Sequence, residues 1–249
     1  MATPERDDGP LRPDDLPEVD AETFEARARA VFTYQMRENP VYRRYCKALG
    51  RSEWDGWAAV PVLPVEAFKQ APVTCFPPEE ADRVFASSGT GTGPRSLHYV
   101  RDLSYYDVSA VAAFEEVFGS GPFTFLAHLP GYEEGGDRSS LVYMADLLIE
   151  RFGGPGSGRF LADREVLRAG VARSRAEGGG LILLGAAFGL LDLIEQRSVD
   201  LPEGARVIET GGMKTRRREM DRSELHARLA EGFGIGEDQV VSEYGMCEL

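Results

Sequence analysis

Apolar and polar residues alternate along the chain with two different periods. Apolar positions recur every three or four residues in several long segments, a spacing that predicts helices at 20–38, 41–50, 103–119, 139–153, 162–180, 187–197 and 221–234. Shorter segments rich in apolar and β-branched residues predict strands at 83–87, 96–100, 123–130, 181–185, 205–210 and 239–245. Because strands and helices alternate over more than half of the chain, we expect an α/β fold: a layered, largely parallel sheet with flanking helices.

Capping residues and prolines mark where these elements end. Ser139, Asp163 and Asp221 are predicted helix N-caps. Residues 1–19 are rich in proline and aspartate, so we expect an acidic tail without fixed structure. Residues 58–80 contain too many prolines for a regular element and are expected to form an extended segment. Residues 20–249 are then predicted to form the folded domain.

Composition and charge restrict the class of partner. The 249-residue chain has a formal net charge of −13 and a sequence pI near 4.8, which argues against a nucleic acid or an anionic membrane as its main ligand. Its three cysteines lack metal-ligand spacing and no secretory leader precedes them, so we expect reduced thiols and a cytoplasmic protein. The longest apolar run, 181–194, is broken by glycines and contains Asp192, so no transmembrane segment is expected. Three isolated histidines, at 98, 128 and 226, show no metal or triad spacing and are expected to be structural.

A glycine- and hydroxyl-rich loop separates two predicted strands. Residues 87–93 have the sequence Ser-Ser-Gly-Thr-Gly-Thr-Gly, and Arg95 follows two residues later. Exposed backbone N–H groups, hydroxyls and a guanidinium together suit an anion. The loop has no P-loop lysine and no helix after it, which excludes the P-loop and the dinucleotide-binding fingerprint. A flexible hairpin turn explains the loop alone equally well.

Two further segments follow predicted strands near the end of the chain. Gly211 and Gly212 end the strand 205–210, where open α/β folds bind ligands and where a flat group such as a nucleobase could approach the backbone. A basic cluster from Lys214 to Arg218 comes next, and either anion contact or a solvated surface would explain it. In the final segment, Tyr244 offers a π face and Glu248 an oxygen ligand for Mg2+. A buried tyrosine and a surface glutamate would also explain that segment.

Taken in order, these segments resemble a known enzyme family. The blocks are "SSGT" with "RS.HY", "LPGY…SSLVYM", "LLG..FGLLDL", "ETGGMK.RR.EM.R.ELH" and "SEYGM.EL". They resemble the adenylate-forming superfamily of acyl and aryl ligases and, within it, the acyl-protein synthetase family, the LuxE-type fatty-acid ligases of bacterial bioluminescence. The blocks run from about residue 83 to residue 249, whereas 20–82 resembles the family more loosely through "VPVLPVEAFK".

The resemblance implies an activity and a set of site residues. Such ligases use ATP to activate a carboxylic acid, here a fatty acid, as an acyl-adenylate and then transfer the acyl group to a thiol. Partners would be the acid and either a reductase or an acyl carrier; no nucleic-acid partner is expected. The implied cofactors are ATP and Mg2+, and Glu248 would hold the Mg2+. The implied polyphosphate-binding residues are Ser87, Ser88, Gly89, Thr90, Gly91 and Thr92. The implied adenine and nucleotide-motif residues are Gly211, Gly212, Tyr244, Gly245, Met246 and Cys247. Gly185 and Phe188 would border the acyl pocket, and Arg95 and Lys214 are candidate catalytic residues.

The chain departs from the family pattern in three ways. Gly91 and Thr92 exchange the usual order of threonine and glycine. Cys247 replaces a hydroxyl expected at the α-phosphate, and losing that hydrogen bond costs about 1–3 kcal/mol. The family continues beyond this motif with a ribose-binding acid, a lid domain with a catalytic lysine, and an acceptor cysteine, so we expect a C-terminally truncated ligase. A catalytically incomplete nucleotide-binding fragment or pseudoenzyme, and a non-enzymatic anion-binding or interaction domain, are the alternatives. The ligase hypothesis requires the three segments to converge on one cleft.

Overall fold

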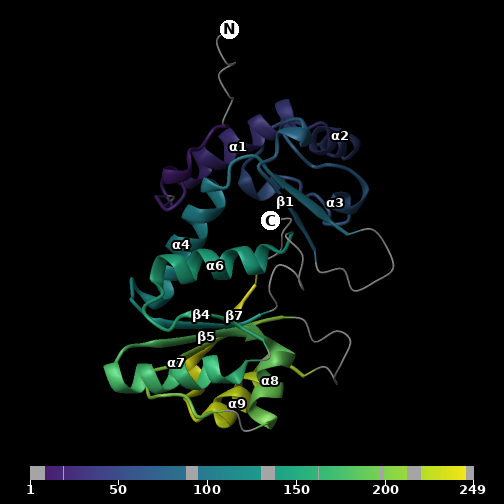
Figure 1. The fold of residues 1–249 in the computed structure, drawn as a ribbon. Helices are drawn as coiled ribbons and strands as arrows, with labels where there is room; N and C mark the ends of the chain where they lie inside the picture. The colour runs from purple at the N-terminus through teal and green to yellow at the C-terminus, as the bar shows by residue number, and fades with distance from the viewer. Residues whose placement is uncertain are drawn as a thin grey trace. The chain divides into compact units, whose positions relative to one another are not determined.

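The computed structural model describes residues 9–18, 20–87, 95–129, 138–161, 163–196, 199–211 and 220–244 (Figure 1). The described residues form two compact units, one from Gly9 to Ala113 and the other from Phe114 to Tyr244. No helix within these described ranges is long and apolar enough to cross a membrane.

The second unit is built on a five-stranded parallel sheet. Its strands are β3 (Thr124–His128), β4 (Gly158–Phe160), β5 (Leu181–Ala186), β6 (Arg206–Thr210) and β7 (Val240–Glu243). They lie in the order β4-β3-β5-β6-β7, and every neighbouring pair is parallel. The predicted α/β fold with a parallel sheet is therefore confirmed. Sequence patterning missed β4 because this edge strand has three residues and carries no run of apolar side chains.

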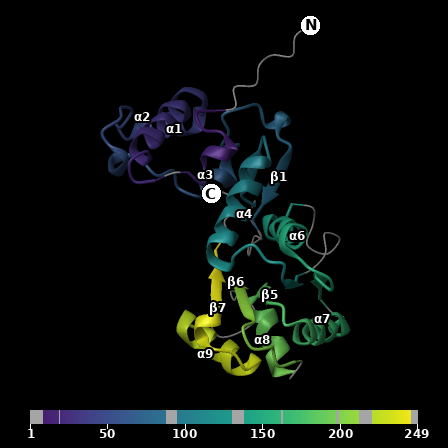
Figure 2. The same ribbon diagram turned by 90° about the vertical axis from the view of Figure 1, so that its left-hand side faces the viewer.

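Helices cover both faces of this sheet. Their bounds are α6 (Ser140–Phe152), α7 (Arg164–Glu177), α8 (Ala187–Glu195) and α9 (Arg222–Phe233), and α4 (Ser104–Phe118) runs from the first unit into the second. α6 lies on one face, and α7, α8 and α9 lie on the other (Figures 1 and 2). The predicted caps are confirmed, since the side chains of Ser139, Asp163 and Asp221 accept hydrogen bonds from backbone N–H groups two or three residues further on.

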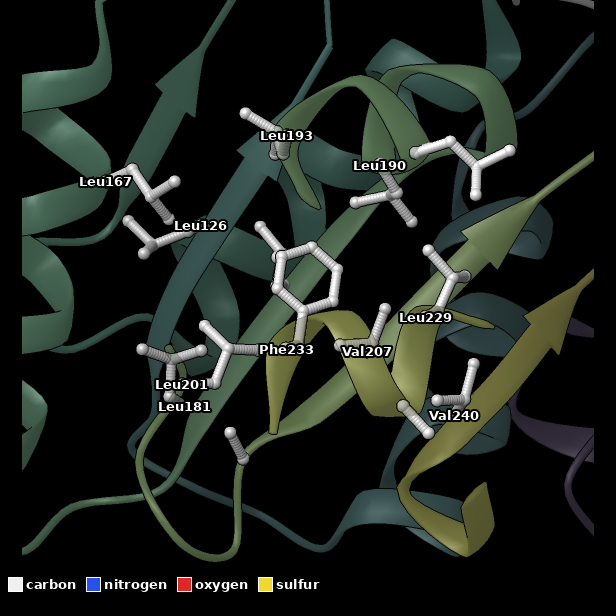
Figure 3. Packing of buried hydrophobic residues seen from close by; sticks show 14 of the residues in the cluster. Leu126, Leu167, Leu181, Leu190, Leu193, Leu201, Val207, Leu229, Phe233 and Val240 are labelled. Carbon is white, nitrogen blue, oxygen red and sulfur yellow. The ribbon is translucent and has the colours of Figure 1, made fainter. Parts of the chain in front are cut away.

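The main core lies between the sheet and the helices α7, α8 and α9. Val207 of β6 and its register partner Val240 of β7 point to this side of the sheet and pack with Leu229 and Phe233 of α9 (Figure 3). Because side chains in a strand alternate between the two faces, the residues two positions after Val207 and Val240 point to the same face, the one covered by α7, α8 and α9. These residues are polar, and they form part of the site described below.

The first unit combines helices with a two-stranded hairpin. It contains α1 (Phe24–Glu38), α2 (Pro40–Ala48), α3 (Ala67–Gln70), β1 (Arg83–Ala86) and β2 (Leu97–Val100). Asn39 ends α1 and caps α2, because its Oδ1 accepts hydrogen bonds from the N–H groups of Val41 and Tyr42 at 3.1 and 3.0 Å. The strands β1 and β2 are antiparallel, as a strand–loop–strand requires.

Two expectations for this unit differ from the structure. Residues 9–18 belong to the segment expected to lack fixed structure, yet they include the 3-10 helix Pro13–Asp15. The phenol of Tyr105 donates a hydrogen bond to the carbonyl of Leu11 at 2.7 Å, so a long-range contact supplies order that composition does not reveal. The proline-rich segment 58–80 is not wholly extended, because it contains α3 and the 3-10 helix Pro78–Glu80.

Candidate functional site

The carboxyl edge of the parallel sheet gathers several of the predicted site residues. Thr210 of β6 is the register partner of both Ala186 at the end of β5 and Glu243 at the end of β7. Gly211 and Tyr244 come directly after two of these paired residues, so they leave adjacent strands at the same edge. This edge is where open α/β sheets bind their ligands.

Gly211 is exposed, and neither its backbone conformation nor its contacts with the described residues require a glycine. A Cβ placed on it would meet no described atom within 4 Å, and its φ lies outside the left-handed region. None of the described residues therefore prevents a ligand from closely approaching the backbone of Gly211. The neighbouring Gly212 and Lys214 lie outside the described residues.

Tyr244 presents its side chain to solvent. The residue is 79% exposed, which rules out the alternative of a buried tyrosine at the strand end. An exposed aromatic ring is a side chain on which a base can stack. Gly245, Met246, Cys247 and Glu248 lie outside the described residues, and so does the predicted Mg2+ ligand among them. In the described part of the chain no group of three or more His, Cys, Asp or Glu residues could hold a metal ion.

The two residues predicted to border an acyl pocket have different environments. Gly185 is buried near the end of β5, and a Cβ on it would lie 2.9 Å from Cδ2 of Leu190 and 3.3 Å from Cβ of His128. Packing alone therefore accounts for this glycine. Phe188 lies in the first turn of α8, directly after β5, and is only partly buried. Of the predicted pair, only Phe188 has a side chain, and this apolar side chain is partly open to solvent at the carboxyl edge.

His128 ends β3 beside these residues. Its Nε2 lies 3.1 Å from the carbonyl oxygen of Leu161, and because a carbonyl only accepts, Nε2 carries a proton. Burial is the main influence on the imidazole and lowers the pKa of His128, although the hydrogen bond to Leu161 and the charge of Asp192 act in the opposite direction. Burial therefore favours the neutral form of His128 at this edge of the sheet.

A polar cluster of one buried and two partly buried residues lies two residues inside this edge and was not predicted. Glu209 of β6 and Ser242 of β7 are register partners on the face covered by α9. The hydroxyl of Ser242 donates a hydrogen bond to Oε1 of Glu209. Nε2 of His226, from α9, lies 3.1 Å from Oγ of Ser242 and 3.4 Å from Oε1 of Glu209. The signal available in the sequence was a glutamate directly after two apolar residues of a predicted strand. Its histidine partner is distant in sequence.

A second carboxylate lies on the opposite face of the same strand ends. Glu243 accepts a hydrogen bond from the side chain of its register partner Thr210. Burial raises the pKa of Glu243, the charge of Glu209 raises it further, and the hydrogen bond from Thr210 lowers it. The exposed positions Gly211 and Tyr244 are therefore preceded by one carboxylate on each face of the sheet, Glu209 two residues before Gly211 and Glu243 directly before Tyr244.

The predicted anion-binding loop belongs to the first unit. Ser87 N–H donates to the carbonyl of Ser96 at 3.0 Å, and Ser96 N–H donates to Oγ of Ser87 at 3.2 Å, so these two residues close the base of the hairpin. Arg95 is exposed beside them. Ser88, Gly89, Thr90, Gly91 and Thr92 lie outside the described residues. The predicted strand–loop–strand is confirmed at its base, while Gly211 and Tyr244 belong to the other unit.

No protein-family model matches the chain, and no curated protein matches its sequence. The class that the structure defines is an α/β protein with a parallel sheet, and the ligase resemblance stays a prediction.

Proposed function

We propose that this chain binds ATP at the carboxyl edge of its parallel sheet and activates a carboxylic acid, such as a fatty acid, as an acyl-adenylate for transfer to a thiol. The observation that supports this most directly is the adjacency of Gly211 and Tyr244. They follow the register partners Thr210 and Glu243, one as open backbone and the other as an exposed ring.

These two residues suit the recognition of adenine. A base needs a flat face to stack on and an edge that it can approach closely, and stacking on an aromatic ring is worth about 1–3 kcal/mol. An exposed tyrosine supplies the first and a glycine with open space beside it supplies the second. Phe188 follows β5 at the same edge and supplies apolar surface for the acid's carbon chain.

The chemistry needs orientation more than a strong nucleophile. The acid's carboxylate oxygen attacks the α-phosphorus of ATP, a new P–O bond forms, and the bond to the leaving pyrophosphate breaks. The protein contributes by aligning the two anions and by donating hydrogen bonds to the polyphosphate. The resemblance to the acyl-protein synthetases implies those donors to be Ser87, Ser88, Gly89, Thr90, Gly91 and Thr92. The same resemblance implies Arg95 and Lys214 as candidate catalytic residues, and Glu248 as the carboxylate that would hold Mg2+.

The test is carboxylate-dependent exchange of labelled pyrophosphate into ATP, measured across acids of increasing chain length, together with calorimetric titration of ATP. We expect ATP binding and exchange that requires an acid. ATP binding without exchange for any acid would refute the enzymatic activity and leave a nucleotide-binding domain. No ATP binding would refute the nucleotide site and leave an anion-binding or interaction domain.

Two variants of one residue make the binding test specific. Tyr244→Ala removes the ring, and we expect the dissociation constant for ATP to rise roughly 5- to 150-fold, which corresponds to the loss of one stacked base. Tyr244→Phe keeps the ring and is the matched control, expected to bind ATP within about twofold of the natural chain because its π face is retained. Equal affinities for both variants would show that Tyr244 does not stack on the nucleotide.

A further inference from the structure

The cluster of Glu209, Ser242 and His226 joins three elements at one point. Glu209 comes from β6, Ser242 from β7 and His226 from α9. The side chains of His226 and Glu209 are only 14% and 7% exposed, so their polar atoms depend on one another rather than on water. The Glu209 carboxylate has contacts with both other members of the cluster.

The hydrogen bonds determine where the protons lie. A carboxylate only accepts, and the single hydroxyl proton of Ser242 is donated to Glu209. Nε2 of His226 then faces two oxygen atoms that have no proton to give it, at 3.1 and 3.4 Å. Nε2 must therefore carry a proton and donate it. One N–H group thus serves acceptors on two neighbouring strands.

The position of these acceptors connects the cluster to the sheet edge. Glu209 lies two residues before Gly211, and Ser242 lies two residues before Tyr244. We infer that His226 is a positioning residue: its Nε2–H ties the ends of β6 and β7 to α9 and so holds Gly211 and Tyr244 side by side. That this pair receives adenine rests on the function proposed above, whereas the tie itself does not.

Removing the donor leaves both acceptors in a poorly hydrated place without their N–H. The acceptors can recover hydrogen bonds only if the strand ends separate enough to admit water, and this opening is local. The core residues Val207 and Val240, two positions earlier in the same strands, are buried and still pack on α9. We therefore expect β6 and β7 to loosen at their carboxyl ends while the rest of the sheet stays closed.

The test compares His226→Leu with His226→Gln by hydrogen exchange and by ATP titration. Leucine fills similar space without a donor, whereas the glutamine amide can still donate. In His226→Leu we expect exchange of the amides in 206–211 and 240–244 to accelerate about tenfold, as for the loss of one hydrogen bond to a charged group, and the dissociation constant for ATP to rise by a similar factor. His226→Gln should restore both to within about threefold. Amides of β3 and β5 serve as the internal control and should not change.

Two results would overturn the inference. Unchanged exchange at both strand ends in His226→Leu would show that no tie exists. Uniformly faster exchange across the whole sheet, with no recovery in His226→Gln, would show a contribution to global stability only. If His226→Leu does not fold, Ser242→Ala replaces it and should accelerate exchange in 240–244. A natural chain that binds no ATP would refute the nucleotide site and with it the positioning role toward adenine, while the exchange measurements still decide the tie.

Discussion

Gly211 offers a test in which stability and binding should change in opposite directions. The perturbation is Gly211→Ala, which adds one methyl group at the exposed carboxyl end of β6. A Cβ at this position meets no described atom within 4 Å, and the backbone φ is one that alanine can adopt. The described residues therefore leave room for the methyl group.

The magnitudes follow from this open geometry. Replacing a glycine whose φ suits alanine reduces the conformational freedom of the unfolded chain and raises the free energy of unfolding by about 0.4–1 kcal/mol. If adenine lies against the Gly211 backbone, the methyl group occupies the space of the base and costs about 1–3 kcal/mol of binding free energy. That cost corresponds to a rise of roughly 5- to 150-fold in the dissociation constant for ATP.

The assay pairs urea unfolding with calorimetric titration of ATP. The matched control is Gly179→Ala, because Gly179 is also exposed, a Cβ on it would also meet no described atom within 4 Å, and it precedes the amino end of β5. We expect the control to change stability in the same direction as Gly211→Ala and to leave ATP affinity unchanged. The amino ends of parallel strands lie at the opposite edge of the sheet, away from the proposed site.

Either half of the result can refute the reasoning. An unchanged dissociation constant for ATP in Gly211→Ala would show that the base does not approach this backbone. A loss of stability in place of a gain would show that Gly211 is needed for folding, and the open geometry would then not explain the glycine. Weaker ATP binding in Gly179→Ala as well would show that the effect is not specific to the carboxyl edge.

Two further predictions concern packing and charge. Leu229→Ala should lower the free energy of unfolding by about 2–5 kcal/mol in urea titrations, because this side chain is fully buried between α9 and the sheet (Figure 3). Leu161→Ala, at a residue that is 43% exposed, should change it by less than about 1 kcal/mol, and equal losses in the two variants would contradict the placement of the core. Burial raises the pKa of Glu243 above its ordinary value of 4.5, so the folded state binds this proton more tightly than the unfolded state does. The natural chain should therefore lose stability as pH rises from about 4.5 through the raised pKa. Glu243→Gln keeps an acceptor for Thr210 and should not show this loss of stability in urea unfolding at a series of pH values. The same pH dependence in both proteins would show that the carboxyl of Glu243 does not cause the loss.

Local sequence signals were sufficient for most of the elements. The helix α9 was predicted with its cap because Asp221 stands just before an apolar period of three and four residues, and in the structure its side chain accepts a hydrogen bond from Glu224 N–H at 2.8 Å. The strand β5 was predicted because five apolar or small residues follow a glycine run. The strand β4 was missed because its pairing with β3, and not its own composition, makes it a strand.

The candidate site shows the same division. The sequence by itself indicated Gly211 as a ligand-binding position, because a glycine at the carboxyl end of a parallel strand suits that role. For Tyr244 that role was implied by the resemblance to the acyl-protein synthetases. Their adjacency is decided by the register of β6 with β7, which pairs residues more than 30 positions apart along the chain. The polar cluster around His226 is likewise a product of tertiary structure. Which strands are neighbours, and which helix covers them, depends on how the apolar faces of all the elements pack together, and that cannot be read from the local pattern of any one of them.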